Sequence, residues 1–290
     1  MSGVWYNALL WLVTIVWGST FFIVKDTVAT VDEFFLVFTR NALAAIPLAI
    51  IALVRYRREM ADRKTILYGA VIGFLLATTY IAQTIGLKFT STGHSAFITG
   101  SAVVVVPFLI VWYYREKFDK ILILPIILTF VGLFVLTYDF ETTVNIGDVI
   151  TLIVVAAYAH HIVFAGRFVK KVHTFSLITY QFIFSALFSL AGYAFTGFPE
   201  IALSESSIWA LVYLGTAGTL FCYFVTVWAQ TKVSPIKVAI IFAMEPVFAV
   251  LFGYFAISET FGPREIAGML TVLGGVVLYQ ILEYRRMVNH

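Results

Sequence analysis

Ten apolar segments, each long enough to cross a bilayer, dominate this 290-residue sequence and limit what it can fold into. A hydrocarbon core about 30 Å thick needs about 20 apolar residues in helical form. Because unpaired backbone groups are costly in lipid, such a chain folds as a bundle of helices that satisfy their own hydrogen bonds. The predicted helices cover residues 4–24, 34–54, 66–87, 93–113, 121–138, 147–166, 174–196, 207–229, 235–256 and 265–283.

The composition excludes an ordinary soluble domain. Hydrophobic residues make up 61% of the chain and charged residues only 12%, which is too little to cover a water-facing surface. The net charge is +3 and the basic residues form no stripe, so no nucleic-acid partner is expected. The single cysteine, Cys222, excludes an intrachain disulfide. The first apolar segment lacks a basic n-region and a cleavage site, and we interpret it as a retained helix.

Basic residues predict the orientation of the helices. Fifteen of the 19 lysines and arginines follow predicted helices 2, 4, 6, 8 and 10, which places them on one side of the membrane. Cytoplasmic loops carry this excess. Both termini are therefore expected in the cytoplasm, in a multi-pass protein of the cell inner (cytoplasmic) membrane.

The two halves of the sequence repeat each other. An offset of 143 residues pairs Tyr80 with Tyr223, Ser91 with Ser234, Glu116 with Glu259 and Gly132 with Gly275, and an offset of 141 pairs Trp17 with Tyr158 and Thr20 with His161. Each repeat, 1–140 and 141–290, holds five helices, so the halves cross the membrane in opposite directions. The predicted fold is an all-α integral membrane protein of two inverted five-helix repeats, an arrangement typical of carriers with a midplane site.

A carboxylate, Glu245, lies near the centre of the ninth helix, and its repeat partner is Ala102, on a face with Thr99. A charge at this depth costs about 2.5 to 3.5 kcal/mol and needs a partner or a water-filled cavity. Glu245 either binds an amine or a proton, or it ties the ninth helix to a neighbour. Pro246 and Pro107 predict kinks near the midplane of the ninth and fourth helices.

Two further groups of polar residues fall on shared helix faces. One comprises Thr79, Tyr80 and Gln83 on the third helix, with the aligned Thr219, Tyr223, Thr226 and Gln230 on the eighth; the other comprises Trp17 and Thr20 on the first, with Tyr158 and His161 on the sixth. They predict a polar cavity, and hydrogen bonding between helices is the alternative. His161 is a candidate for substrate or proton handling or a buried structural histidine. Arg40 is a structural anchor or a gate.

No catalytic, nucleotide-binding or metal-binding motif is present. GxxxxGKS, GxSxG and HExxH are missing, and the adjacent His160 and His161 do not share a helix face. We therefore predict that the protein is not an enzyme and has no cofactor and no metal.

Several segments resemble the EamA-like family of the drug/metabolite transporter superfamily. They are WGSTFFIVK at 17–25, FTRNALAAIPL at 38–48, GLKFTSTGHSAFITGSAVVVVPFL at 86–109 and EPVFAVLFGYFAISETF at 245–261. The glycine that usually precedes the helix-end glutamate in this family is replaced by Arg115 and Ser258. The resemblance implies a central cavity walled by helices 1 to 4 and 6 to 9, outer supports in helices 5 and 10, and export or exchange of small metabolites, most often amino acids.

The leading hypothesis is a secondary transporter, either an exporter or a facilitator, that moves a small metabolite such as an amino acid by alternating access. Its predicted substrate-binding residues are Trp17, Thr20, Thr79, Tyr80, Gln83, Thr99, Tyr158, His161, Tyr223 and Glu245, and Glu245, His161 and Arg40 are assigned to coupling or gating. Its expected partners are a small-molecule substrate, the lipid bilayer and a coupling proton, and it is a monomer or homodimer. The alternatives are a non-transporting sensor or assembly subunit, and an intramembrane transferase using His161 and Glu245.

Overall fold

A computed structural model describes the chain except residues 1–2, 138–144, 202, 258–261 and 290, and its described residues contain helices, turns and loops but no strand. The elements are α1 (Gly3–Thr27), α2 (Glu33–Arg55), α3 (Arg57–Met60), α4 (Arg63–Phe89), α5 (Thr92–Gly100), α6 (Ala102–Tyr114), a 3-10 turn (Lys120–Leu122), α7 (Ile123–Thr137), α8 (Ile146–Phe168), α9 (Thr174–Phe195), α10 (Glu205–Gly215), a π-helical segment (Thr216–Phe221), α11 (Cys222–Ala229), α12 (Pro235–Phe242), α13 (Glu245–Ile257) and α14 (Pro263–Asn289). They form ten spans that are long and apolar enough to cross a membrane, so the predicted fold class is confirmed. The predicted repeat boundary at 140/141 lies outside the described residues.

Polar side chains in the loops fix where the spans begin. Asp32 caps α2, Asp62 caps α4 and Ser91 caps α5, each by accepting hydrogen bonds from backbone amides of the first turn. Asn145 and Asp148 form a reciprocal capping box at the start of α8. These side chains satisfy amides that a helix leaves unpaired, and they stand where polar loops meet apolar segments.

Two spans are interrupted at positions that the repeat relates. The fourth span breaks at Ser101, between α5 and α6, and the ninth breaks at Met244, between α12 and α13. The two breaks are separated by the same offset of 143 residues. Pro246 lies just after the second break, as expected, but Pro107 lies inside α6, away from the first. At the first break, the Ser101 hydroxyl donates to the carbonyl of Ile98 at 2.6 Å, a bond that competes with regular helix geometry.

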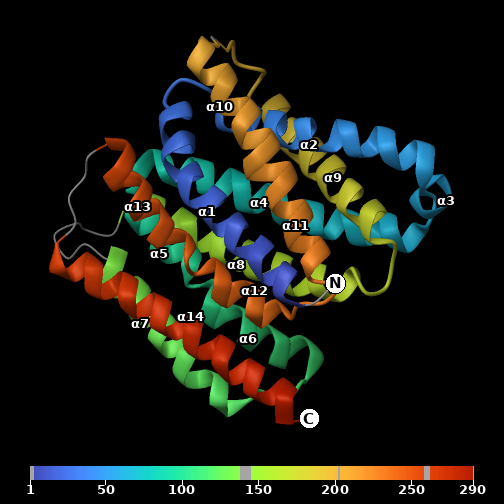
Figure 1. Cartoon of the computed structure of the whole chain (residues 1–290). Helices are drawn as coiled ribbons and strands as arrows, with labels where there is room; N and C mark the ends of the chain where they lie inside the picture. The colour runs from blue at the N-terminus through green and yellow to red at the C-terminus, as the bar shows by residue number, and fades with distance from the viewer. Residues whose placement is uncertain (1–2, 138–144, 202, 258–261, 290) are drawn as a thin grey trace.

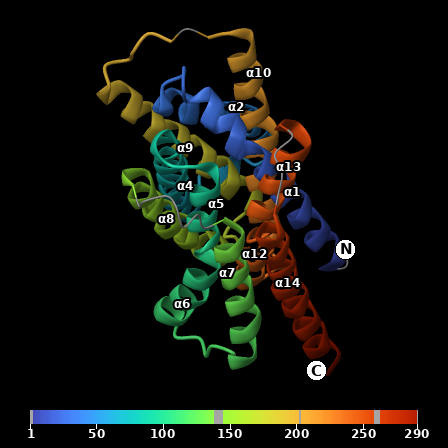
Figure 2. The ribbon, with the colours of Figure 1, turned by 90° about the vertical axis from the view of Figure 1, so that its left-hand side faces the viewer.

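The packing of α7 against α14 shows the two-fold relation between the repeats directly. These helices lie side by side at the periphery (Figures 1 and 2). A Cβ on Gly132 would stand 2.5 Å from the backbone nitrogen of Val272, and a Cβ on Gly275 would stand 2.8 Å from that of Thr129. The offset of 143 residues converts one contact into the other. Small residues allow this close backbone approach in membranes, and α7 and α14 thus form a paired outer support.

The remaining helix contacts bring the two repeats together at the centre of the molecule. Helix α4 packs against α8 and α9, α2 packs against α9, and α1 packs against α11 and α13. The larger hydrophobic core includes Trp17, Tyr80, Tyr158 and Tyr223, which come from both repeats. The interface between the repeats is therefore also the interior of the protein.

Candidate functional site

A small buried cavity lies between the repeats. Its lining residues are Trp17 and Thr20 of α1, Thr79, Tyr80 and Gln83 of α4, Thr99 of α5, Tyr158 of α8, Tyr223 of α11 and Glu245 of α13. These are nine of the ten residues that the sequence predicts to meet a substrate. Their shared position is a property of the structure, whereas their contact with a substrate stays a prediction.

Aromatic rings form much of the cavity wall. The ring centroid of Trp17 lies 6.2 Å from that of Tyr158 and 5.0 Å from that of Tyr223, and Tyr80 lies 5.6 Å from Tyr223. Tilted and edge-to-face arrangements of this kind are favourable, and the faces of such rings attract cations. All four side chains are buried, so the cavity is closed by aromatic surface.

A π-helical segment in the eighth span supplies a backbone acceptor behind this wall. The carbonyl of Gly218 accepts hydrogen bonds from Trp17 Nε1 at 2.8 Å and from the Tyr80 hydroxyl at 3.2 Å. A π turn breaks the regular i to i−4 pattern, and such turns are frequent at functional sites. The apolar pattern of the sequence predicts an uninterrupted helix here, and the run of small residues at 215–219 is the only local signal of a change.

Glu245 is the first residue of α13, directly after the break in the ninth span, and it is 8% exposed. Within the described part of the chain, no hydrogen bond or ion pair joins its carboxylate to another residue, so a tie to a neighbouring helix is not observed. Two more groups of the wall, Thr99 Oγ1 and the Tyr158 hydroxyl, are buried without a hydrogen-bond partner. A second, smaller void also touches these three residues. Buried polar groups normally have a partner, and here water or a ligand would supply it.

The aligned polar residues of the eighth span divide between two roles. Tyr223 lines the cavity, but Thr219 accepts a hydrogen bond from Arg40. Thr226 donates within its own helix, and Gln230 Nε2 donates to a carbonyl of α8 at 2.8 Å. Hydrogen bonding between and within helices, the alternative interpretation, therefore describes Thr226 and Gln230.

His161 lies outside the cavity wall, unlike its predicted companions Trp17, Thr20 and Tyr158. Its Nε2 pairs with Gln181 Oε1 at 2.8 Å, and its ring stands edge-on to Tyr223 with centroids 5.2 Å apart. His161 thus supports Tyr223 from behind. Gln181 is not predictable from the sequence pattern, because its contact with His161 depends on how α9 is rotated against α8.

Arg40 of α2 points into the bundle and is only 1% exposed. Its Nε donates to Thr219 Oγ1 at 2.8 Å, and its Cζ lies 3.6 Å from the centroid of the Tyr80 ring. A gating contact with an external carboxylate is not seen among the described residues. Arg40 instead stacks directly on a residue of the cavity wall.

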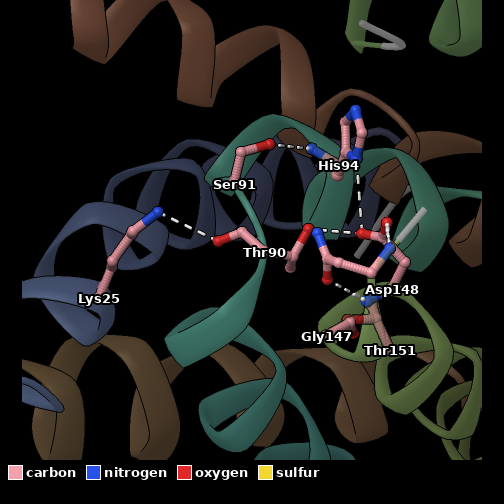
Figure 3. Close-up of polar contacts among 8 residues, drawn as sticks. Lys25, Thr90, Ser91, His94, Gly147, Asp148 and Thr151 are labelled. Carbon is pink, nitrogen blue, oxygen red and sulfur yellow. Dashed lines mark hydrogen bonds and ion pairs between the residues drawn. The ribbon is translucent and has the colours of Figure 1, made fainter. Parts of the chain in front are cut away.

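Polar contacts gather where the linker between α4 and α5 meets the start of α8, at the end of the bundle that is predicted to face outward; Figure 3 shows these contacts. Asp148 accepts a hydrogen bond from the Thr90 hydroxyl and lies 3.4 Å from Nδ1 of His94. Lys25 Nζ donates to the Thr90 carbonyl at 3.1 Å. Asp148, Thr90 and His94 are all buried, so this cluster holds the linker between α4 and α5 against the start of α8.

The opposite end of the bundle, predicted to be cytoplasmic, is hollowed instead. A pocket lies between the ends of α6 and α8 and the start of α12, and its lining includes Tyr114, Arg167 and Lys170. The polar cluster and this pocket therefore lie at opposite ends of α8.

Two five-helix halves that enclose a buried polar cavity are typical of membrane transport proteins. The profile of the EamA-like transporter family matches residues 4–138 and 145–280. This chain belongs to that family.

Relatives from archaea and bacteria match most of the chain, and two of the following three are named as uncharacterized transporters. An uncharacterized transporter of Archaeoglobus fulgidus is 26% identical over 274 residues, covering 93% of this chain and 84% of the relative. The uncharacterized transporter YoaV of Bacillus subtilis is 20% identical over 285 residues, covering 95% and 97%. Protein PagO of Salmonella typhimurium is 26% identical over 269 residues, covering 88% and 87%. A solved crystal structure shares the fold with a TM-score of 0.81, at 13% identity and 98% coverage of this chain and 99% of the other.

Proposed function

We propose that this protein is a secondary transporter that exports or equilibrates a small amine-bearing metabolite, such as an amino acid, across the cytoplasmic membrane. One observation carries the proposal: Glu245 and aromatic rings from both repeats enclose a single buried cavity. The ammonium group of the cargo would meet the Glu245 carboxylate and the faces of Trp17 and Tyr158, while hydroxyl groups of the wall bind its polar parts.

Alternating access is the proposed mechanism. In inverted repeats, each half is able to adopt the conformation of the other, which gives two states that open to opposite sides around one site. The related breaks at Ser101 and Met244 are consistent with this, because each supplies a bending point in a span that reaches the cavity. The cluster at Asp148 would then open in the outward-facing state.

A proton is the proposed coupling ion. Glu245 has no partner among the described residues, so one carboxylate serves both an ammonium group and a proton, and the two compete for it. Competition for a single site exchanges one for the other across the membrane, which would drive export of the cargo with proton entry. An imposed pH gradient should accordingly change the flux.

Counterflow in liposomes tests the proposal. Radiolabelled amino acids should accumulate with the unaltered protein, and Glu245→Gln should reduce accumulation to background, because the amide lacks the charge. Thr137→Val is the matched control: Thr137 is as buried as Glu245, but its hydroxyl bonds only within α7. Normal counterflow by Glu245→Gln would refute this role of the carboxylate. Saturable binding without flux would favour the sensor or assembly-subunit alternative.

A further inference from the structure

We propose that Arg40 is the anion-binding pole of the central cavity, which makes the cargo a zwitterion and not a simple amine. The inference rests on the proposed transport function and narrows its substrate class. It assigns Arg40 to cargo selection, a role different from the anchor or gate that the sequence suggested.

The first observation is a pair of buried, unpaired charges. In the described part of the chain no carboxylate contacts Arg40, and no cation contacts Glu245. The guanidinium of Arg40 has a neutral hydroxyl and a neutral ring as its contacts, and neither cancels its charge. A lone charge at membrane depth is costly, and a ligand with the opposite charge would offset that cost.

The second observation is the position of Arg40 directly behind the cavity wall. Its Cζ lies 3.6 Å from the ring of Tyr80. Its Nη2 stands 3.5 Å from the point where a Cβ on Gly218 would lie, and the methyl group of Thr20 stands 3.1 Å from the same point. Tyr80 and Thr20 both line the cavity. Because the interior is a medium of low dielectric, the charge is felt across this single layer of side chains.

The third observation is that both charges break the symmetry of the repeats. The offset of 143 residues pairs Glu245 with Ala102, and the offset of 141 that relates the first two spans to the sixth and seventh pairs Arg40 with Gln181. Tyr80 and Tyr223, the aromatic residues that Arg40 and the Gln181–His161 pair support, are themselves matched. A polar cavity that is built twice therefore carries its cation in the first repeat alone and its anion in the second alone.

These charges would orient a ligand that bears both signs. Its ammonium group would face Glu245 on α13, and its carboxylate would face Arg40 across Tyr80 and Thr219. The guanidinium would attract the carboxylate across this wall by its charge, which a lysine keeps but carries on a single nitrogen without stacking on the ring. An amine without a carboxylate would leave the positive pole unmatched.

Binding of matched ligand pairs tests the assignment. The probes are leucine with 3-methylbutylamine and tyrosine with tyramine, in which the amine differs from the amino acid only by the missing carboxylate. The unaltered protein should bind the better amino acid at least tenfold more tightly than its amine. Arg40→Gln should weaken binding of the amino acid about 10- to 100-fold and binding of the amine less than about threefold, because only the amino acid loses the attraction between its carboxylate and the guanidinium. Arg40→Lys, which keeps the charge, should fall between the two proteins.

The outcomes separate the possible roles of Arg40. Equal weakening of amino acid and amine by Arg40→Gln would show that Arg40 only pins α2 to the π-helical segment, and it would overturn the proposal. Equal affinity of the unaltered protein for both ligands of a pair would overturn it as well, without any variant that has to fold. Binding of the amines but of no amino acid would leave the proposed function standing and refute the zwitterion. If the unaltered protein binds none of the four probes, the result would count against the proposed function itself.

Discussion

The polar cluster at Asp148 should hold the outward end of the bundle closed, and weakening it should expose the cavity from that side. The Asp148 carboxylate accepts hydrogen bonds from the Thr90 hydroxyl and from the backbone amide of Asn145, and it lies beside His94. Just below, a Cβ on Gly147 would stand 2.6 Å from the carbonyl of Gly86, so α4 and α8 touch through their backbones. The closure therefore consists of one charged cluster above one close backbone contact.

The change Asp148→Asn keeps the size of the side chain and removes its charge. A hydrogen bond to a charged group contributes about 1.5 to 3 kcal/mol and a neutral one about 0.5 to 1.5 kcal/mol. The state with a closed outward end should therefore be destabilised by about 1 to 2 kcal/mol relative to the state with an open one. This difference raises the ratio of open to closed molecules about 5- to 30-fold.

Cysteine labelling measures this opening without background, because Cys222 is the single cysteine of the sequence and Cys222→Ser leaves no other thiol. In that background, Gln83→Cys places a reporter in the cavity wall on α4. A membrane-impermeant maleimide added outside should label it about 5- to 30-fold faster when Asp148→Asn is present. Lys88→Gln is the control, since it breaks a partly exposed ion pair with Glu33 that joins α4 to α2 and should matter little. An unchanged labelling rate, or an equal rise with Lys88→Gln, would refute the closure.

Two further predictions concern stability. Gly275→Ala should lower the free energy of unfolding by about 1 to 3 kcal/mol without changing ligand affinity, because the new Cβ would stand 2.3 Å from Thr129 Oγ1. Gly274→Ala is the control and should be neutral, because its Cβ would meet nothing within 4 Å. Equal thermal unfolding of the two variants would contradict this prediction. Hydrogen bonds from the side chain and backbone of Thr65 lower the pKa of Asp62 in the folded protein, so this cap stabilises α4 above about pH 4 and loses its effect as pH falls through the folded pKa. Asp62→Ala should thus reduce stability at pH 7, and its difference from the unaltered protein should shrink in acid, as urea unfolding at both pH values would show.

The sequence predicts the spans and most of the cavity wall for a physical reason. Lipid requires long apolar helices, and the repeat then states which helix faces correspond, so Tyr80 and Tyr223 or Trp17 and Tyr158 are found together without a structure. Glu245 stands out because a carboxylate is costly at that depth. These signals come from the solvent and from symmetry, and both can be read along a single chain.

Contacts that depend on how two helices are rotated against each other were not predicted. The Gln181–His161 pair and the Thr90–Asp148 bond each join residues from different helices whose relative rotation the sequence does not state. The π-helical segment at Gly218 is stabilised by donors from α1 and α4, which local propensity cannot include. The hydroxyl of Ser101 is a local signal for the break in the fourth span, but the sequence prediction placed the kink at Pro107, which lies inside α6.

The distribution of charge between the repeats bears on how cargo would drive the transport cycle. Arg40 belongs to the first repeat and Glu245 to the second, and the proposed alternating access would move the repeats against each other. A cargo with both charges would therefore bind both moving halves at once and stabilise the state in which they enclose it. An amine without a carboxylate would meet only the second repeat, and its binding would favour closure less. Selectivity and closure would then depend on the same pair of buried charges.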